Sequence, residues 1–597
     1  MKVFFKAAAL IAVMSLLMAV VSCSFYPGKS NDYLYELEYT EFPTRAYNAD
    51  KVHPIRQTGT VTGSEAVSEL SDIEWDYIRH ALGDNYLDLC WTFNYPEKAG
   101  ISIDKPTFGK VGPGDIKGEC VYLTGLLERL YKIDYESLDK QDRDFYEHIV
   151  FNLEEERYIK QYEGFYYMVP VKEPSSIGSF YMTVSYVNVR NRTEIEKYIE
   201  LLKDTGRYYD EVCEFEELRS KKGYASIEEF YTKCSKNFYM LSQESQTGPF
   251  REDFIEKLNA VEGLTEDEKK AYTDQFDKVM EEVVVPEFTK CCKCIAALAG
   301  TNTNDKGLAG FKHGKEYYEH LLRMDIGRDC NVKELAKGLD EVLKMKADDK
   351  GAPVIEGNSN REMLDIISKK AWEYFPELDI NYEIKKLPEI FKASNIAGLY
   401  AAKGLDDPSC EVIFLKDVNN TKTIAFHEGI PGHMYQFNYF KTKLKHMGMF
   451  AFVNNTYSEG WATYIMENPA GMYDPSSSGG FKYNGSIYRG YMAQARADIL
   501  INYEGMSGSE ASDYLKGLSP DLPDIHTDDI TITPCTGIYY GLGCYMTLKT
   551  LEKIKELDPE MDIRTMHRLY LDAGPGCFDR ILASAKREYG SDKSNNG

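Results

Sequence analysis

The chain carries, at positions 423–436, the stretch Thr-Ile-Ala-Phe-His427-Glu428-Gly-Ile-Pro-Gly-His433-Met-Tyr-Gln. Two neutral imidazoles can hold a divalent metal ion, and a carboxylate directly after the first can accept a proton from metal-bound water. The usual zinc-protease signature is His-Glu-x-x-His, with its histidines four residues apart on one helical face. Here His427 and His433 are six positions apart, which would point them roughly 120° from each other on a straight helix.

The Pro-Gly pair inside this stretch offers a way to bring the two histidines together. Pro431 lacks an N–H, and its ring would clash with the carbonyl group of residue 427 in a regular helix. Gly432 tolerates the unusual dihedral angles that a bulge needs. A two-residue bulge would return His433 to the side of His427. The stretch therefore predicts a metal-binding helix with a Pro-Gly insertion.

A third ligand is expected from a second motif, Asn455-Thr-Tyr-Ser-Glu459-Gly-Trp-Ala-Thr-Tyr464. A carboxylate followed by Gly-Trp-Ala is unusual for a solvated surface, and it suits a helix that packs tightly against the first motif. Two histidines and one glutamate, with a fourth position left for water, form a catalytic rather than a structural zinc site.

Together the two motifs resemble those of a known family, the bacterial domain of unknown function 885, which is grouped with gluzincin-type metallopeptidases. Its pattern is His-Glu-x-x-Pro-Gly-His followed by Glu-Gly-Trp-Ala, and both parts stand intact here, with further likeness from about residue 70 to residue 590. The resemblance implies a large, mainly α-helical, zincin-like metallopeptidase with a few short strands beside the active-site helix. It also implies one Zn²⁺ per chain, bound by His427, His433 and Glu459, with Glu428 as the general base.

The chain departs from the family pattern near the expected oxyanion donor. Of an Arg-x-x-x-Asp-x-Gly-x-His run only Asp498 is kept in register, and Thr536 replaces the glutamine of a Pro-Gly-Gln-x-x-x-Tyr pattern whose tyrosine matches Tyr540. A zinc hydrolase needs a donor near the developing oxyanion. Tyr540 is the first candidate, with Tyr539 and Arg496 as weaker ones. The chain has 45 tyrosines, so packing is the competing interpretation.

Four other polar residues are weaker candidates. Asp498 and Glu467 could orient the ligand imidazoles, as metal-bound histidines usually require, or could be solvated helix acids. His526 and His567 are candidates for pocket residues, but packing or surface roles are favoured for both.

The N-terminus predicts the compartment. A short basic region is followed by an apolar run of about 15 residues, which is shorter than the roughly 20 that a helix needs to cross a bilayer. The run ends in Val20-Val-Ser-Cys23, which is typical of a lipobox, the site where a bacterial lipoprotein is cleaved and its cysteine acylated. We therefore expect a signal peptide over residues 1–22 and a lipid on Cys23 that anchors the protein to the outer face of a membrane.

Charge and cysteine content exclude some functions. The formal net charge is −25, which opposes nucleic-acid binding because phosphates repel such a chain. The 13 cysteines are scattered through a long chain, unlike a disulfide scaffold. Cys291-Cys292-Lys-Cys294 is too compressed to wrap one zinc ion and is interpreted as a helix face with packed thiols. A redox or second-metal role is the alternative.

Periodicity gives the expected organisation. Apolar residues at helical spacing recur from Ser64 onward, with one helix opening at Ser71 and others over 194–218 and 265–285. Strand-like pieces are predicted at 165–170, 180–187 and 411–415, and the last is expected to offer its edge to an extended peptide. A loop at 474–480 is a candidate rim. We expect a lipid-anchored tether at 23–62 and an N-terminal helical half at 63–300. A C-terminal catalytic half with the metal site is expected at 301–590, followed by a flexible tail at 591–597.

The function predicted from these features is hydrolysis of peptide bonds by a membrane-anchored, extracytoplasmic zinc enzyme. Two alternatives stay open. One is a metal-containing lipoprotein that binds peptides without cutting them, which the presence of Glu428 disfavours because binding needs no proton acceptor. The other is a zinc hydrolase of esters or non-peptide amides. The sequence does not separate endopeptidase from exopeptidase action.

Overall fold

A computed structural model describes residues 58–595, with gaps at 84, 172–179, 181–183, 185–186, 245–247, 303, 329, 348–358, 388–397, 403, 408–409, 417–421, 451–453 and 468–484. The fold is mainly α-helical, as the periodicity predicts, with one small three-stranded sheet. The signal peptide, Cys23 and the loop at 474–480 lie outside the described residues.

Up to residue 300, the regular elements among the described residues are all helices. In chain order they are α2 (Gly63–Leu82), α3 (Tyr86–Thr92), η4 (Pro96–Ala99), α4 (Ile116–Leu130), η5 (Tyr135–Ser137), α5 (Lys140–Lys160), α6 (Glu163–Tyr166), α8 (Arg192–Lys221), α9 (Glu228–Glu244), α10 (Pro249–Ala260), α11 (Glu266–Val279), η6 (Met280–Val284) and α12 (Val285–Ala296). The helices expected over 194–218 and 265–285 are confirmed.

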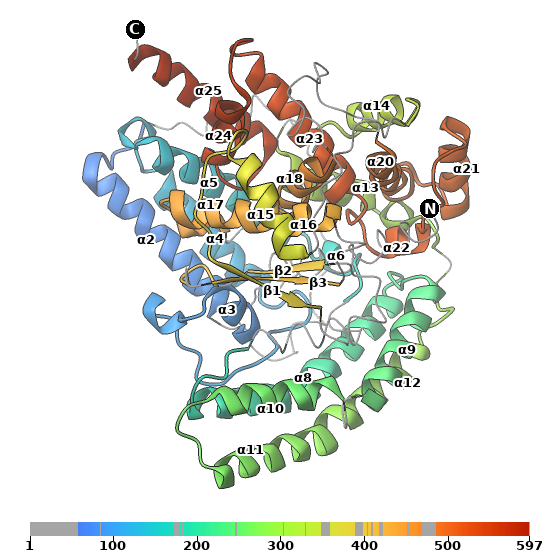
Figure 1. Cartoon of the computed structure of the whole chain (residues 1–597). Coiled ribbons are helices and arrows are strands. Elements are labelled where there is room, and N and C mark those ends of the chain that lie inside the picture. The colour runs from blue at the N-terminus through green and yellow to red at the C-terminus, as the bar shows by residue number, and fades with distance from the viewer. Residues whose placement is uncertain are drawn as a thin grey trace.

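The C-terminal half adds the sheet to a larger set of helices. The helices are η7 (Gly307–Gly310), α13 (Gly314–Ile326), α14 (Val332–Leu343), α15 (Asn360–Ala371), α16 (Lys422–Glu428), α17 (His433–Lys443), η10 (Met447–Phe450), α18 (Asn455–Glu467), α20 (Ser486–Ile499), η11 (Leu500–Glu504), α21 (Gly508–Leu518), α22 (Thr527–Ile532), α23 (Ile538–Lys555), α24 (Ile563–Asp572) and α25 (Phe578–Asn595). In Figure 1 the sheet lies between these helices and the green helices α8 to α12.

Four local predictions are corrected. Helix α2 begins at Gly63 rather than at Ser71, because its buried face already starts with Ala66 and Leu70. Residues 165–170 form the end of α6 and a turn rather than a strand. The side chains of Phe165 and Met168 are buried in the core. Where 180–187 is described, it is helical at Phe180 and Val184. Helix α25 continues to Asn595, into the segment expected to be a tail.

The sheet has the order β1-β3-β2, with β1 (Tyr382–Lys386), β2 (Gly398–Ala401) and β3 (Glu411–Leu415). The strand predicted at 411–415 is confirmed, but it is the central strand. It pairs in parallel with β1, with Tyr382 opposite Glu411, and antiparallel with β2, with Tyr400 opposite Ile413. The expectation that 411–415 offers a free edge is therefore wrong, and β2 is the edge strand nearer the metal motif.

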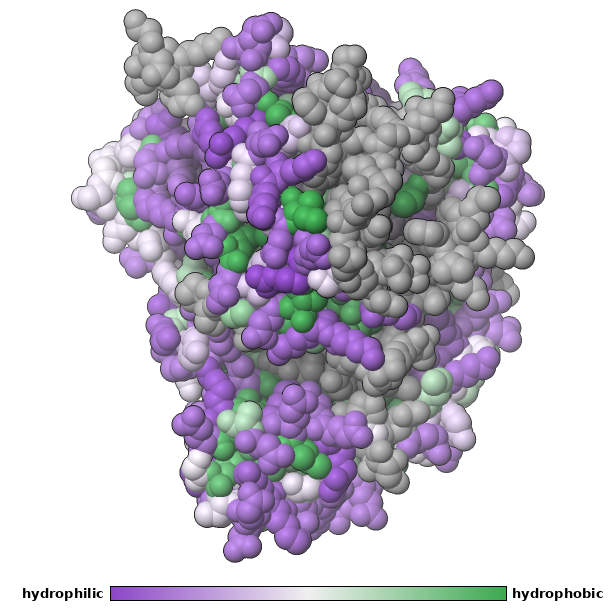
Figure 2. Space-filling view, viewed as in Figure 1, coloured by the Kyte–Doolittle hydropathy of each residue, from purple (hydrophilic) through white to green (hydrophobic). Residues whose placement is uncertain are grey.

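Three hydrophobic cores hold the described helices together. The largest gathers residues 308–585 with three from the α5–α6 region, the second almost only residues 78–298, and the third residues 66–153 with Met449. Hydrophilic residues cover most of the described part of the face in Figure 2, and hydrophobic ones form small separate patches there. The division between cores falls near residue 300, while the domain boundaries themselves stay a prediction. Among the described helices, none combines the length and apolarity needed to cross a bilayer.

Candidate metal centre

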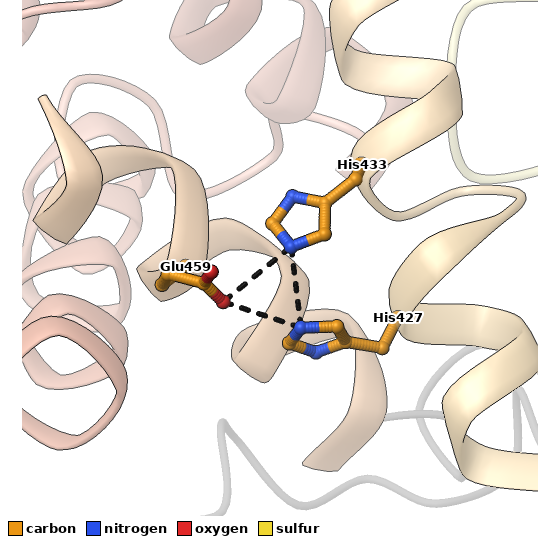
Figure 3. Close-up of side chains that lie close together, drawn as sticks. All are labelled: His427, His433 and Glu459. Atoms are coloured by element: carbon orange, nitrogen blue, oxygen red, sulfur yellow. Dashed lines mark hydrogen bonds and ion pairs between the residues drawn. The ribbon is translucent and has the colours of Figure 1, made fainter. Parts of the chain in front are cut away.

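Three side chains that lie in two sequence motifs converge on one point (Figure 3). The Nε2 atoms of His427 and His433 are 3.2 Å apart. The Oε2 atom of Glu459 lies 3.2 Å from the first and 3.4 Å from the second. Within the described part of the chain, this is the one group of three or more histidine, cysteine or acidic residues whose ligand atoms lie close enough to share a metal ion.

The spacing of these atoms fits a zinc ion. Zinc bound by imidazole nitrogen and carboxylate oxygen at about 2.0–2.2 Å, in tetrahedral geometry, places its ligand atoms roughly 3.4 Å from one another. All three separations at the site are close to that value. A zinc ion held by these three residues would keep a fourth position for water or substrate, as in catalytic zinc sites.

The two histidines are brought together by a break between helices. Helix α16 ends at Glu428, and α17 begins at His433, so the chain makes two short helices rather than one helix with the predicted bulge. A Cβ at Gly432 would lie 2.0 Å from the carbonyl oxygen of His427, so this turn can pass so close to α16 only at a glycine. The predicted convergence is confirmed, and its mechanism is corrected.

Helix α18 supplies Glu459 and is fixed to the first motif by a tryptophan. The indole Nε1 of Trp461 donates a buried hydrogen bond of 2.9 Å to the carbonyl oxygen of Pro431. Gly460, directly between Glu459 and Trp461, packs against Gly543 of α23, where an added Cβ would meet backbone atoms at 2.4 Å. In the Glu-Gly-Trp sequence, Glu459 is the candidate ligand and Gly460 permits the close helix contact. Trp461 donates the hydrogen bond to the Pro-Gly break.

Burial and charge at the site support a bound cation. His427, His433 and Glu459 are each less than a tenth exposed. Burial opposes the ionisation of Glu459, but the neighbouring His433 and His427 outweigh it and lower its pKa to about 2. The pKa of His433 is raised, because Glu459 and then Glu428 outweigh the effect of its burial. Glu459 Oε2 accepts no well-aligned hydrogen bond from the described residues, and a buried carboxylate oxygen left so is suited to a metal ion.

A serine that the sequence did not single out orients one ligand. Ser458 Oγ lies 3.3 Å from His433 Nδ1 and donates a long hydrogen bond of 3.5 Å to Gln436 Oε1. The other ring nitrogen of a ligand imidazole usually donates to such a partner. His427 Nδ1 is buried and has no hydrogen-bond partner among the described residues. The only sequence signal for Ser458 was its position directly before Glu459.

The carboxylate predicted as general base lies beside the ligands. Glu428 is buried, and its charge contributes to the raised pKa of His433. Its Oε2 accepts a hydrogen bond of 2.9 Å from the backbone N–H of Tyr400 in β2. That strand is fixed in turn, because the hydroxyl of Tyr400 donates to Glu411, which also pairs with Lys441. Sequence reasoning missed this role of β2.

Tyr540, the first candidate for the oxyanion donor, lies next to a ligand. Its buried ring stacks on that of His427, with centroids 6.2 Å apart, and on that of Tyr491, with centroids 5.0 Å apart. Tyr539 is also buried, in the first turn of α23. The structure brings Tyr540 to the site, and its catalytic role stays a prediction.

Arg496 is engaged elsewhere. Its guanidinium pairs with Asp340 and Glu504 at 2.8 Å and lies over the ring of Tyr514. These contacts tie α20 to α14, η11 and α21, and none of them belongs to the metal site. The structure therefore gives Arg496 a role in packing rather than in oxyanion binding.

Asp498 does not orient a ligand imidazole. It accepts hydrogen bonds from Tyr318, from Asn502 and from the backbone N–H groups of Cys535 and Gly537. Burial raises its pKa to about 6, although these donors act in the opposite direction. Asp498 thus holds the turn from which α23 starts toward Tyr540.

The remaining candidates have structural positions. His567 is fully buried, with Nδ1 at 2.8 Å from the carbonyl oxygen of Tyr374 and Nε2 at 2.7 Å from the hydroxyl of Tyr464. His526 is exposed at the start of α22. Both agree with the expected packing and surface roles. Glu467 ends α18, and its side chain lies outside the described residues.

Comparison with known proteins places the chain in a family. The pattern described as "Bacterial protein of unknown function (DUF885)" matches residues 99–351 and 358–580. The chain belongs to this family. No curated protein gives a significant match.

Two solved structures share the fold of this family member. One, a "putative lipoprotein" from Colwellia psychrerythraea, is 14% identical and has a TM-score of 0.70, over 89% of this chain and 100% of its own. The other, a "putative lipoprotein of unknown function" from Shewanella oneidensis, is 14% identical and has a TM-score of 0.53, over 87% and 98%. At this identity the likeness extends to the fold alone.

Proposed function

We propose that the protein is a lipid-anchored, extracytoplasmic zinc hydrolase that cleaves peptide bonds. The observation that carries the proposal is the convergence of His427, His433 and Glu459 at separations of 3.2–3.4 Å, with Glu428 beside them. Two imidazoles, one carboxylate and an open fourth position are the ligand set of catalytic zinc sites.

Glu428, Tyr400 and Tyr540 each have a separate role in the proposed reaction. A zinc ion, when bound, polarises the scissile carbonyl group and makes water a stronger acid. Glu428 accepts the proton of the attacking water and returns it to the leaving amine. The N–H of Tyr400 holds Glu428 Oε2, which leaves Oε1 for this transfer. Tyr540 donates a hydrogen bond to the oxyanion.

The anchor rests on the N-terminal sequence. An apolar run that is too short for a membrane span ends at Val20-Val-Ser-Cys23. The two similar structures carry the description of lipoprotein for their own chains. We place the enzyme on the outer side of a bacterial membrane, where peptides or other amides outside the cytoplasm are its substrates.

The decisive experiment compares the wild-type chain with Glu428→Gln. We expect about one zinc ion per chain in both proteins by elemental analysis. Only the wild type should cleave a mixed peptide library, with the variant slower by about 10²–10⁴-fold, because the amide cannot accept a proton. Glu341→Gln on α14, a largely exposed residue, is the matched control and should cleave normally.

The other outcomes discriminate between functions. Zinc in both proteins without peptide cleavage in either would favour the peptide-binding lipoprotein, unless an ester or a non-peptide amide is hydrolysed by the wild type alone. Absence of metal from the wild type would overturn the proposal as a whole. The cleavage positions distinguish an endopeptidase from an exopeptidase.

A further inference from the structure

Far from the metal centre along the chain, three thiols meet between two helices of the N-terminal half. Cys213 lies on α8 and its Sγ is 3.7 Å from Sγ of Cys291 on α12. Cys294, three positions after Cys291, lies on the same face of α12, and the nearby Cys213 thiol is the first cause of its raised pKa. Cys213 therefore stands between two possible partners.

The three thiols differ in their access to solvent. Cys213 is 6% exposed and Cys291 is fully buried, whereas Cys294 is partly exposed and approaches Glu217. Cys292 points in another direction, with Sγ 3.5 Å from Ser235 on α9. Cys292 is therefore an internal control, because it lies on the same helix and outside the thiol cluster.

We propose that Cys213, Cys291 and Cys294 form a thiol–disulfide exchange site, in which Cys294 receives an external disulfide and Cys213 and Cys291 end as a buried cross-link. These thiols fall outside the one group of described residues that is compact enough for a metal ion. A disulfide needs its sulfurs at about 2.05 Å, so the closing movement from 3.7 Å is small.

The reaction balances with a small disulfide, R–S–S–R, as the oxidant. Cys294 attacks one sulfur and releases R–SH, which leaves a mixed disulfide on Cys294. Cys213 attacks the Cys294 sulfur of this mixed disulfide and releases the second R–SH, which forms the Cys213–Cys294 bond. Cys291 then attacks Cys213 and releases the Cys294 thiol. In total two thiols are oxidised, one external disulfide is reduced, and Cys294 is regenerated.

The surroundings make this exchange slow and its product durable. The pKa of Cys213 is raised, first by the Cys291 thiol beside it. The pKa of the entry thiol Cys294 is raised as well, first by Cys213, so little reactive thiolate of either residue is present at neutral pH. The finished bond joins residues 78 positions apart in a buried place, and such a cross-link stabilises the helices it joins. The site is independent of the metal centre and requires an oxidising compartment, which the predicted export supplies.

The test uses the full-length chain, purified in detergent in the reduced state and treated with oxidised glutathione. Free thiols are then alkylated, and the peptides are mapped by mass spectrometry. We expect a Cys213–Cys291 cross-linked peptide, alkylated Cys294, and an increase in the thermal midpoint that a reductant reverses. Failure of Cys213 to enter any cross-link with Cys291 or Cys294 would overturn the proposal, while the metal centre would be unaffected.

Single substitutions assign the roles. Cys294→Ser should give the same cross-link roughly tenfold more slowly, because the accessible entry thiol is missing. In Cys291→Ala, the reaction should stop at the Cys213–Cys294 disulfide. Cys292→Ser should form the same cross-link as the wild type at the same rate. An unchanged rate in Cys294→Ser would refute its entry role. Thermal midpoints of the reduced variants show whether each is folded, and Cys291→Ser replaces Cys291→Ala if the latter is not.

Discussion

At the scale of single residues, neither candidate histidine ligand has a charged hydrogen-bond partner at its Nδ1 atom among the described residues. His433 has a serine hydroxyl at Nδ1 rather than a carboxylate, and His427 Nδ1 has no partner among the described residues. A carboxylate in this position would raise the basicity of the ligand. The ring orientation of His433 therefore depends on Ser458 and on the hydrogen bond from Ser458 to Gln436.

Removal of this hydroxyl should weaken metal binding. Ser458→Ala leaves all three ligands in place and frees the ring of His433, so we expect zinc affinity to fall by roughly 10- to 100-fold. Competition with a chromophoric chelator measures it. Thr442→Ala on α17, whose hydroxyl donates to backbone carbonyl groups of its own helix, should leave the affinity unchanged. Equal affinities in wild type and Ser458→Ala would show that Ser458 does not position His433.

The three candidate ligands could be picked out of the sequence, but the groups around them could not. Histidine is rare in this chain, with 10 in 597 residues, and His427, His433 and Glu459 lie in two recognisable motifs. The hydroxyl of Ser458 and the N–H of Tyr400 are groups that occur throughout any chain. Only their position in space distinguishes them, and that position depends on the packing of elements far apart in sequence.

At the scale of elements, the centre depends on close contacts between helices. Gly432 permits the turn from α16 to α17, and the facing Gly460 and Gly543 allow α18 and α23 to pack backbone against backbone. The sequence indicated a break at Pro431, yet a bulge and a pair of helices satisfy the same local pattern. The choice between them is made by tertiary contacts such as the bond from Trp461 to Pro431.

Gly460→Ala should test this helix contact. The new Cβ would lie 2.4 Å from the backbone of Gly543, so α18 must shift. We expect the free energy of unfolding to fall by about 1–3 kcal/mol. Zinc affinity should fall as well, because Glu459 moves with its helix. Urea unfolding and chelator competition measure the two effects.

The matched control is another glycine inside a helix. Gly125 lies in the middle of α4, is exposed and has nothing within 4 Å of an added Cβ. Gly125→Ala should stabilise the protein by about 0.5–1 kcal/mol, because alanine restricts the unfolded chain and favours the helix. Similar effects of the two substitutions would contradict the role given to the α18–α23 contact.

At the scale of the whole molecule, helical periodicity predicts the class of fold but not how the helices and strands pack against one another. Amphipathic spacing marks long helices such as α8, because each buries one face. The same local pattern predicts a strand at Glu411–Leu415 but not its partners, β1 and β2. Those partners decide that β3 is central. The aromatic run at 165–170 is not a strand, because Phe165 and Met168 enter the same core three positions apart, which is a helical rather than an alternating spacing.

Acid should weaken the whole fold through a buried histidine. His567 joins α24 to α18 and to Tyr374: its Nδ1–H donates to the carbonyl oxygen of Tyr374, so Nε2 accepts from the hydroxyl of Tyr464. That arrangement requires the neutral ring. Burial lowers its pKa from 6.5 to about 4. The unfolded chain therefore binds a proton between these values while the folded protein does not, so stability is lost as pH falls from 6.5 to 4.

The expected loss from this one group is about 3 kcal/mol across that window, at roughly 1.4 kcal/mol per unit of pKa. His567→Gln cannot take up a proton, so the free energy of unfolding should vary less with pH between 6.5 and 4 than in the wild type, by about this amount. His526→Gln, at an exposed position, should keep the wild-type dependence. Unfolding in a chelator removes any contribution from protonation of bound metal ligands. If wild type and His567→Gln lose stability in parallel, the fold does not depend on a neutral His567.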